Sequence, residues 1–311
     1  MTAHPLTTPA ARNAIETAVS GHLGRRWQID DTTDLAARSS HPAMILRGEG
    51  LAVFAKLASG PGAQTQVLSE LADLNLIGTL AGVKVPQAVG VGSVDIPEGG
   101  CVLLFEALVE RVPEDRTRAD WESIGRTLAR VHSVRGGRFG LEQNGYFGQL
   151  PQDNTPVPGG TWADFYRERR VLPSLATAVA AGSVDEVTAR RVERLLARLD
   201  DLAGPEPQPS LLHGDAQHHN FVSTAAGAVV IDPSPYFGHP EFDLALLDYF
   251  TPVPDATFNA YAEVQPIAAG FPERRELWRL FAYLGVLTVD AGGHFGRSFI
   301  PKFTAALDRY L

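Results

Sequence analysis

One segment of the chain, residues 211–232 (LLHGDAQHHNFVSTAAGAVVID), constrains the protein more than any other. Within it, Asp215 is followed after four residues by Asn220, and Asp232 lies twelve residues further on. The spacing D-x-x-x-x-N is that of the catalytic loop of protein kinases. Asp215 could accept the hydrogen bond of an acceptor hydroxyl, while Asn220 and Asp232 offer the oxygen ligands that Mg²⁺ prefers. The segment therefore predicts phosphoryl transfer from ATP.

The stretch between the two metal-ligand candidates, FVSTAAGAVVI, is typical of a tight β-hairpin with AAG at its turn. Such a hairpin folds Asn220 and Asp232 back onto one another, so that both could contact the same ions. Taken singly, each polar residue is equally well explained as a turn or cap residue. The complete spacing, followed by a hairpin that ends in Asp, favours the catalytic interpretation. We expect His213 to brace the loop through hydrogen bonds.

Four histidines, His213, His218, His219 and His239, raise the alternative of a metal cluster. Zinc sites combine His with Cys or carboxylates, and the adjacent pair His218–His219 lacks the spacing that places two imidazoles on one ion. We therefore do not predict zinc. His218 and His219 are instead candidates for contact with solvent or substrate.

Upstream, Lys56 is a lone lysine in the apolar stretch VFAKL. It could extend its ammonium group into solvent from the end of a strand. Together with the downstream motif, it favours a clamp on the α- and β-phosphates of ATP. Glu70 follows fourteen residues later on a predicted helix and is placed to pair with Lys56. Ser39 and Ser40 precede the first strand of a predicted hairpin and could cover the phosphates, although no G-x-G-x-x-G is present.

Hydrophobic periodicity predicts a small α+β lobe followed by a mostly helical remainder. Helices are predicted at about residues 9–23, 64–80, 119–133, 161–180, 184–203, 241–250, 255–263, 272–288 and 299–311, strands at 43–48, 51–57 and 101–108, and a turn at 93–100. We expect an ATP-binding lobe over 1–106 and a catalytic and substrate-binding lobe over 107–311. The strand CVLLFEAL ends where the lobes should join, so the backbone groups of Glu106 and Leu108 could hold an adenine.

Charge and composition exclude several classes of protein. The 311 residues carry a net charge of −9, which argues against a nucleic-acid partner. The densest basic run, RERR at 167–170, is interpreted as a solvated helix face. The single cysteine, Cys101, lies in an apolar run and predicts a buried, inert thiol. No signal peptide or stretch of 18 apolar residues is evident, so we expect a cytoplasmic protein, monomeric or weakly dimeric, that contacts no membrane.

Beyond the catalytic segment, several further motifs resemble the fructosamine kinase (ketosamine kinase) family, a branch of the aminoglycoside-phosphotransferase-like and protein-kinase-like superfamily. The resemblance covers about residues 40–300. The motifs that carry it are VFAKL, SELADL followed by VKVP, VLLFEAL, FGLEQNGYFGQLPQDN, WADFYRERRVLPSL, LLHGDAQHHN and, most specifically, IDPSPYFGHPEFDLA.

This resemblance implies a bilobal protein-kinase-like fold, ATP and Mg²⁺ as cofactors, and phosphorylation of a hydroxyl on a sugar-bearing small molecule. It places the catalytic base at Asp215, the metal ligands at Asn220 and Asp232, and the ion pair at Lys56 and Glu70. It also implies that Asp243 braces the catalytic loop and that Tyr236, in IDPSPYFGHP, lies near the substrate.

The chain departs from the family where the acceptor should bind. The family pattern HGDLW-x-GN is replaced here by Ala216-Gln217, with His219 before the asparagine. An aromatic wall is lost and polar groups are gained, so Gln217, His218 and His219 are candidates for substrate contact. Near the C-terminus, the segment GVLTVDAGGHFG is apolar where the family tends to have Asn and His. The acceptor pocket is therefore expected to differ.

These departures leave more than one function open. The first is a ketosamine-type sugar kinase, and the second is an antibiotic kinase that phosphorylates an aminoglycoside or a sugar-bearing nucleoside. A third, a non-catalytic pseudokinase, predicts the loss of Lys56, Asp215, Asn220 or Asp232, and all four are present.

Overall fold

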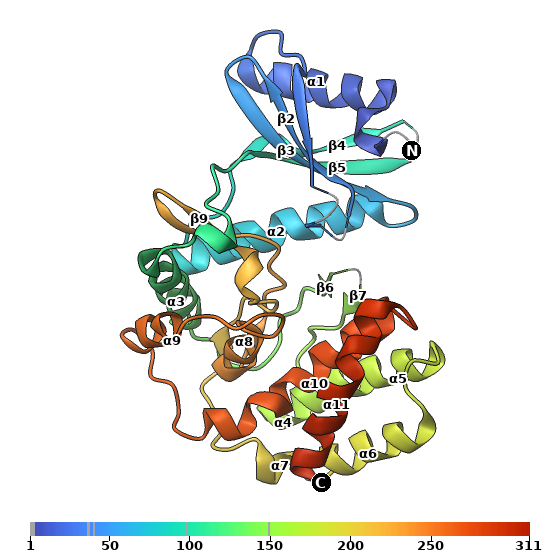
Figure 1. The fold of residues 1–311 in the computed structure, drawn as a ribbon, viewed down its shortest axis with the longest axis vertical. Helices are drawn as coiled ribbons and strands as arrows, with labels where there is room; N and C mark the ends of the chain where they lie inside the picture. The colour runs from blue at the N-terminus through green and yellow to red at the C-terminus, as the bar shows by residue number, and fades with distance from the viewer. Residues whose placement is uncertain (1–3, 36–37, 40, 98, 149) are drawn as a thin grey trace.

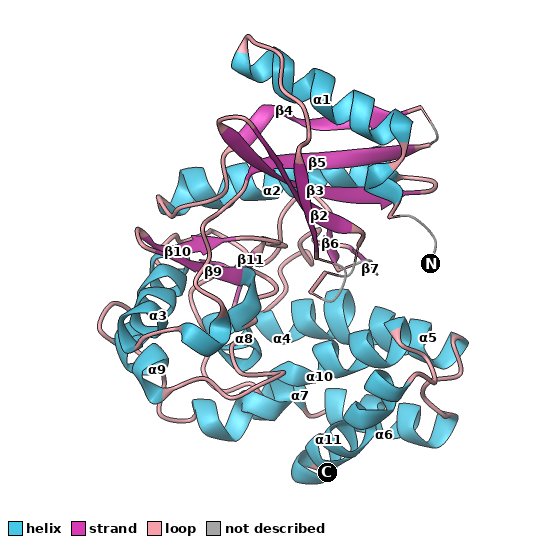
Figure 2. Cartoon of the chain, turned by 45° about the horizontal axis from the view of Figure 1, so that its top comes forward, coloured by secondary structure: helices cyan, strands magenta, loops and turns pink. Residues whose placement is uncertain are grey.

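The computed structural model describes residues 4–311 except 36–37, 40, 98 and 149, and it has two lobes (Figure 1). The smaller, N-terminal lobe holds an antiparallel sheet with helices, and the larger, C-terminal lobe is mostly helical (Figure 2). The predicted fold class is thereby confirmed. Within the described residues, no helix is long and apolar enough to cross a bilayer.

A five-stranded antiparallel sheet forms the small lobe in the order β1-β2-β3-β5-β4. Its elements are β1 (Asp31–Asp34), β2 (Ala43–Gly48), β3 (Leu51–Ser59), β4 (Ala88–Ile96) and β5 (Gly100–Glu106), with helices α1 (Pro9–Leu23) and α2 (Ala63–Ala81) and a 3₁₀ turn at Pro5–Thr7. The turn predicted at 93–100 is wrong in its first half, because β4 continues to Ile96. A register shift between Ala88 and Ser93 lets β4 continue pairing with β5.

Helices α1 and α2 cover opposite faces of this sheet (Figure 1). Successive side chains of a strand point to opposite faces. Along β5, Val102 and Leu104 therefore pack with the α1 side, while Cys101, Leu103 and Phe105 pack with the α2 side. This inner strand is apolar on both faces and ends at Glu106. Cys101 is buried and free, as predicted, and burial raises the pKa of its thiol to about 11.

The larger lobe contains the predicted helices with shifted ends. Its helices are α3 (Arg118–His132), α4 (Trp162–Phe165), a π-helical turn (Tyr166–Val171), α5 (Leu172–Ala180), α6 (Glu186–Leu196), α7 (Leu199–Leu202), α8 (Pro240–Leu246), α9 (Asp255–Ala262), α10 (Phe271–Val289) and α11 (His294–Tyr310), with 3₁₀ turns at Pro113–Asp115 and His218–Asn220. Short strands are β6 (Gly145–Phe147), β7 (Leu150–Gln152), β8 (Ser210–Leu211), β9 (Phe221–Thr224), β10 (Gly227–Val230) and β11 (Phe237–Gly238). An apolar core links these helices around Trp162, Phe242 and Trp278.

The prediction that residues 167–170 form a solvated basic face is wrong for Arg170. This side chain is fully buried, its guanidinium lies 4.0 Å from the ring centre of Tyr236, and its Nη1 donates to the carbonyl of Asp153 at 2.9 Å. The aromatic face and the backbone carbonyl replace the hydration that the cation loses. Neither partner is close in sequence, so periodicity alone could not identify them.

One carboxyl group on α2, that of Asp73, is buried and has no ion pair with a described residue. Asp73 is 6% exposed, and its side chain accepts a long hydrogen bond of 3.5 Å from the Ser69 hydroxyl. Burial raises the pKa of Asp73 to about 7, and the Ser69 bond offsets this only in part. Ionisation of Asp73 in the folded state is therefore unfavourable.

We predict that Asp73→Asn stabilises the protein more at alkaline than at acidic pH. Because the folded pKa lies above the unfolded value, the folded state binds the extra proton, and stability is lost as the pH rises toward 7. Thermal melts should show a larger gain in Tm for the variant at about pH 8 than at about pH 5. Asp201→Asn, at an exposed position of α7, is the control. A gain independent of pH would contradict the prediction.

Candidate active site

The β9–β10 hairpin brings the two ends of the predicted catalytic segment together. Its strands pair antiparallel with Val222 opposite Val229, and the backbone N–H of Ile231 donates to the carbonyl of Asn220 at 3.0 Å. Asp232 follows directly, so it lies next to Asn220, as the hairpin pattern in the sequence predicted. The only positive φ of a non-glycine residue among those described, 47°, is at Asp232. Backbone strain of this kind is typical of functional sites.

Asp215 is held by two side-chain amides. Asn220 Nδ2 donates to the Asp215 carboxylate and to its backbone carbonyl, both at 2.9 Å. Gln217 Nε2 lies 3.2 and 3.4 Å from the two carboxylate oxygens. Burial raises the pKa of Asp215 to about 7, and these two amide donors limit the rise. A carboxyl group with a pKa near neutrality suits a general base.

Lys56 connects both lobes through two short ion pairs. Its Nζ lies 2.6 Å from Glu70 Oε1 on α2 and 2.7 Å from Asp232 Oδ1 beyond the hairpin. Burial opposes the charge of Lys56, but the two carboxylates outweigh it and raise its pKa above the ordinary value. Burial likewise opposes ionisation of Asp232, but Lys56 lowers its pKa to about 2. Burial raises the pKa of Glu70, which shares the same cation.

The carboxylate of Asp243, on α8, binds the backbone of the catalytic loop. Its carboxylate accepts from the backbone N–H groups of His213 at 2.6 Å and Gly214 at 3.0 Å, and it lies 2.9 Å from His132 Nε2. All of these groups are buried, so the carboxylate exchanges water for three donors. His132 was not predicted from the sequence, because its two partners, Tyr261 and Asp243, lie 129 and 111 residues away along the chain.

The loop conformation itself depends on His213 and Gly214. The N–H of Asp215 donates to His213 Nδ1 at 3.2 Å, so the opposite nitrogen, Nε2, carries the proton and donates to the Ile231 carbonyl at 3.2 Å. Burial lowers the pKa of His213, which favours this neutral form. Gly214 has a φ of 83°, and a Cβ there would lie 1.9 Å from the Ser234 carbonyl oxygen, so no other residue fits.

The other residues predicted to face the nucleotide lie before β2 and at the end of β5. Ser39 lies in the loop before β2, and its hydroxyl accepts from the His41 N–H at 3.3 Å. Ser40 lies outside the described residues. Glu106 ends β5, and its N–H donates to the Gln87 carbonyl at 2.8 Å. Leu108 follows in the segment that leads to α3.

The four predicted substrate residues separate into two groups. Gln217 is half-buried beside Asp215, and His219 is exposed. Tyr236 and His218 are both buried. Tyr236 is completely buried and stacks on Phe165. His218 is also buried, with Nε2 2.6 Å from the Thr251 hydroxyl and Nδ1 3.2 Å from Arg116 Nη1, so both of its ring nitrogens are already engaged by the protein.

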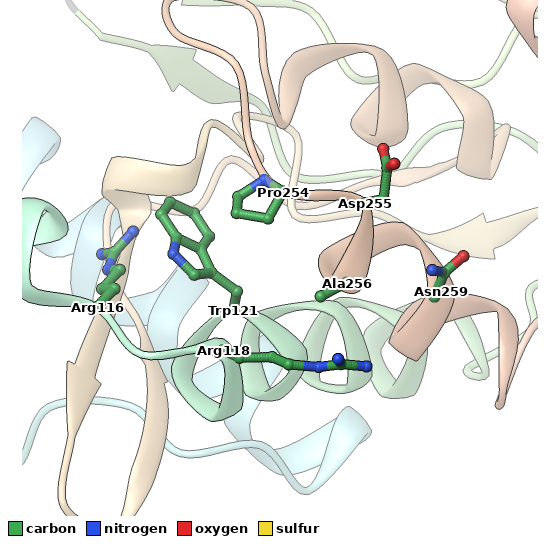
Figure 3. Close-up of a pocket in the computed structure, with 7 residues that line it drawn as sticks. All are labelled: Arg116, Arg118, Trp121, Pro254, Asp255, Ala256 and Asn259. Atoms are coloured by element: carbon green, nitrogen blue, oxygen red, sulfur yellow. The ribbon is translucent and has the colours of Figure 1, made fainter.

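A surface cavity of about 500 Å³ lies between α3 and α9 (Figure 3). Its lining residues are Arg116, Arg118, Trp121, Pro254, Asp255, Ala256 and Asn259. None of these residues was predicted to bind a ligand. Across the described part of the chain, no group of three or more His, Cys, Asp or Glu side chains is placed to hold a metal ion.

Comparisons with known proteins agree with this geometry. The sequence profile of the fructosamine kinase family matches residues 11–311. Escherichia coli YniA, named a probable ketoamine kinase, is 30% identical over 289 residues, which cover 90% of this chain and 94% of YniA. The solved structure of a candidate fructosamine-3-kinase from Thermobifida fusca is 30% identical, with a TM-score of 0.78 over 96% of this chain and 98% of that chain.

A more distant solved structure shares the fold. The structure of an aminoglycoside phosphotransferase, APH(4)-Ia, superposes with a TM-score of 0.58 at 15% identity and covers 94% of this chain and 96% of that one. At this identity the likeness concerns the fold alone. The family profile, by contrast, spans nearly the whole chain, including every element that carries Lys56, Asp215, Asn220 and Asp232. The chain therefore belongs to the fructosamine kinase family.

Proposed function

We propose that the protein is an ATP-dependent kinase that transfers the γ-phosphate to a hydroxyl of a ketosamine, a sugar linked to an amine. One observation carries this proposal. Lys56 forms ion pairs with both Glu70 and Asp232, and in the neighbouring loop Asn220 forms a hydrogen bond with Asp215. Family membership and the ketoamine kinase name of a relative support the choice of acceptor.

ATP would lie between the lobes with its phosphates toward Lys56. The N–H of Glu106 and that of Ala107 already donate within the small lobe, to Gln87 and Ala52. We therefore assign the adenine contacts to the Glu106 carbonyl and the Leu108 N–H. Ser39, in the loop before β2, would lie over the phosphates. In this arrangement Lys56 offsets phosphate charge, and Glu70 fixes the position of its ammonium.

The donor set suits Mg²⁺. Asn220 uses its amide N–H groups to bind Asp215, which leaves its carbonyl oxygen for a hard cation. Asp232 adds a carboxylate whose pKa of about 2 keeps it ionised. Two protein oxygens together with substrate phosphates and water are the usual Mg²⁺ environment in such enzymes. When bound, the ion would neutralise charge on the phosphates.

The transfer itself needs little from the protein beyond positioning. The acceptor hydroxyl donates to the Asp215 carboxylate, and its oxygen attacks the γ-phosphorus in line with the bridging oxygen of ADP. The new O–P bond forms as the bond from the γ-phosphorus to that bridging oxygen breaks. The hydroxyl proton passes to Asp215, and the products are a phosphate ester and ADP. The raised pKa of Asp215 favours its taking this proton.

An antibiotic phosphotransferase is the second candidate, and it is less well supported. It is favoured by Gln217, which stands where the family has an aromatic residue beside the acceptor, and by the shared fold of APH(4)-Ia. A pseudokinase is disfavoured because Lys56, Asp215, Asn220 and Asp232 are all present, with Lys56 paired to Asp232 and Asn220 bound to Asp215. We further propose a cytoplasmic protein that acts as a monomer or weak dimer on a small sugar-bearing substrate, without nucleic acid. The net charge of −9 and the single buried thiol support this.

A coupled assay of ADP release tests the proposed acceptor. The substrates are fructoselysine, a ribulosamine, an aminoglycoside and a sugar-bearing nucleoside antibiotic, each with ATP and Mg²⁺. Turnover of the ketosamines is expected. Turnover of an antibiotic alone would overturn the ketosamine assignment, and no turnover with any acceptor would favour the pseudokinase.

We predict that Asp215→Asn lowers kcat by about 100-fold or more, because a general base contributes about 10²–10⁴-fold. The amide keeps the size of the side chain, so thermal stability should change little, and a melting curve checks this. Asp201→Asn is the matched control for the same chemical change at an exposed site. Near-normal turnover by Asp215→Asn would contradict the proposed role of the carboxylate.

We predict that Asp243→Asn damages both stability and turnover. In wild type, each of the two carboxylate oxygens accepts a hydrogen bond from one backbone N–H, of His213 or of Gly214. Asparagine keeps only one of these oxygens, and its NH₂ group then faces the other backbone N–H, donor against donor. A buried donor left without an acceptor costs about 1–3 kcal/mol. Tm should fall. The loop that carries Asp215 shifts, so the fold decrease in kcat should exceed the fold increase in the KM for ATP. A variant with unchanged Tm and unchanged kcat would show that the carboxylate is dispensable.

A further inference from the structure

The segment after α8 is attached to the catalytic loop at two points. The backbone N–H of His218 donates to the Leu247 carbonyl at 3.3 Å, and His218 Nε2 lies 2.6 Å from the Thr251 hydroxyl. Tyr249 lies between these two attachments. It is therefore held beside the loop that carries Asp215, on a segment that the phosphate-binding network does not use.

The hydroxyl of Tyr249 is a buried donor without a partner. The residue is 5% exposed, and its hydroxyl makes no hydrogen bond in the described structure. Burial raises the pKa of Tyr249, the neighbouring Tyr283 and Glu276 add to this, and Asp215 contributes through its negative charge. Buried polar groups nearly always have a partner, and an exception calls for an explanation. A phenol near the catalytic carboxylate is explained if a ligand supplies the missing acceptor.

An aromatic stack runs from Tyr249 toward the surface. The Tyr249 ring is stacked on Phe299 of α11 with 5.3 Å between centroids, and it meets Phe250 edge-on at 4.8 Å. Phe295 completes the group, 5.2 Å from Phe299 and 6.0 Å from Phe250. Phe250 is half-buried and Phe295 is 53% exposed. The stack thus begins on the segment attached to the catalytic loop and ends in an exposed ring.

Lys302, Asp248 and Glu276, near Tyr249 and Phe299, already have partners within the protein. Lys302 Nζ lies 4.7 Å from the ring centre of Phe299, so one aromatic face already has a cation. Asp248, beside Tyr249, is bound by Arg275 at 2.6 Å and by Arg279 at 2.5 Å. Glu276 is also paired with Arg279, at 2.7 Å. No uncompensated carboxylate is therefore offered to an additional ammonium group by Asp248 or Glu276.

We propose that Tyr249, Phe250 and Phe295 form the acceptor subsite of this kinase, and that its preferred substrates are ketosamines whose amine carries an uncharged aryl or alkyl group. The Tyr249 hydroxyl donates to a sugar oxygen next to the reacting hydroxyl. Phe250 and Phe295 pack against the apolar group. This inference rests on the proposed function and specifies its substrate class. It also places an aromatic wall beside Asp215 in a chain that has lost the tryptophan of the HGDLW pattern.

Three ketosamines that differ only in the amine portion test the substrate class: those of fructose with benzylamine, glycine and lysine. Steady-state kinetics of ADP release should give a kcat/KM about 10-fold higher for the benzylamine adduct, since an aromatic contact adds to the buried apolar area. Equal or lower kcat/KM for the benzylamine adduct would overturn the proposed class. Turnover of none of the three would overturn the ketosamine function as well, which separates the two failures.

Two variants test the residues. Tyr249→Phe removes only the hydroxyl and should raise the KM of all three ketosamines by about fivefold to tenfold, the effect of one hydrogen bond, with the KM for ATP unchanged. Phe295→Ala should raise KM for the benzylamine adduct by about threefold to tenfold, the effect of one aromatic contact, and leave that of the glycine adduct unchanged.

The controls come from the same region. Tyr283→Phe removes a phenol that already donates to Glu276 at 2.7 Å, and Ile300→Ala removes an exposed apolar group from α11. Both should keep the wild-type acceptor KM. Thermal melts establish that each variant is folded. Wild-type KM values in Tyr249→Phe and Phe295→Ala, or the same rise in the two controls, would overturn the subsite.

Discussion

The ion pairs of Lys56 join the parts of the molecule that must act together. One ammonium group contacts a carboxylate from α2 and another from the end of the catalytic segment, so it relates strand β3, helix α2 and the large lobe. Burial alone would favour the neutral form of a lysine, and only nearby negative charge keeps it protonated. Glu70 and Asp232 supply that charge. The position of the small lobe and the charge state of the site thus depend on the same contacts.

Asp243 has the corresponding role inside the large lobe. A buried carboxylate is stable only when donors replace its water, and here two backbone N–H groups and His132 do so. The same bonds fix the backbone of His213 and Gly214, and therefore the direction in which Asp215 points. The catalytic loop is thus held rigidly on its buried side. The chain departs from its family further along the same loop, at Ala216, Gln217 and His219.

Sequence patterns predicted the features that depend on neighbours in the chain. The hairpin between Asn220 and Asp232 was found because its turn residues and apolar strands are contiguous, and Lys56 was found because a charge in an apolar strand is unusual. The packing of distant segments was not predictable in this way. Arg170 is buried because Tyr236 and Asp153 enclose it, and His132 contacts Asp243 across 111 residues. Strand β1 was missed because DTTD has no apolar alternation.

The two sides of Asp215 differ in how completely their polar groups are satisfied. On the phosphate side, Lys56 already contacts Asp232, and Asn220 already contacts Asp215, which is consistent with a site formed before substrate arrives. On the other side, the Tyr249 hydroxyl is buried without a partner and the aromatic stack ends in an exposed ring. A preformed network with paired charges can serve many acceptors equally. Discrimination between acceptors must therefore come from the side of Tyr249, where polar groups still lack partners. Only there does a bound acceptor supply a hydrogen bond that the free protein does not already have.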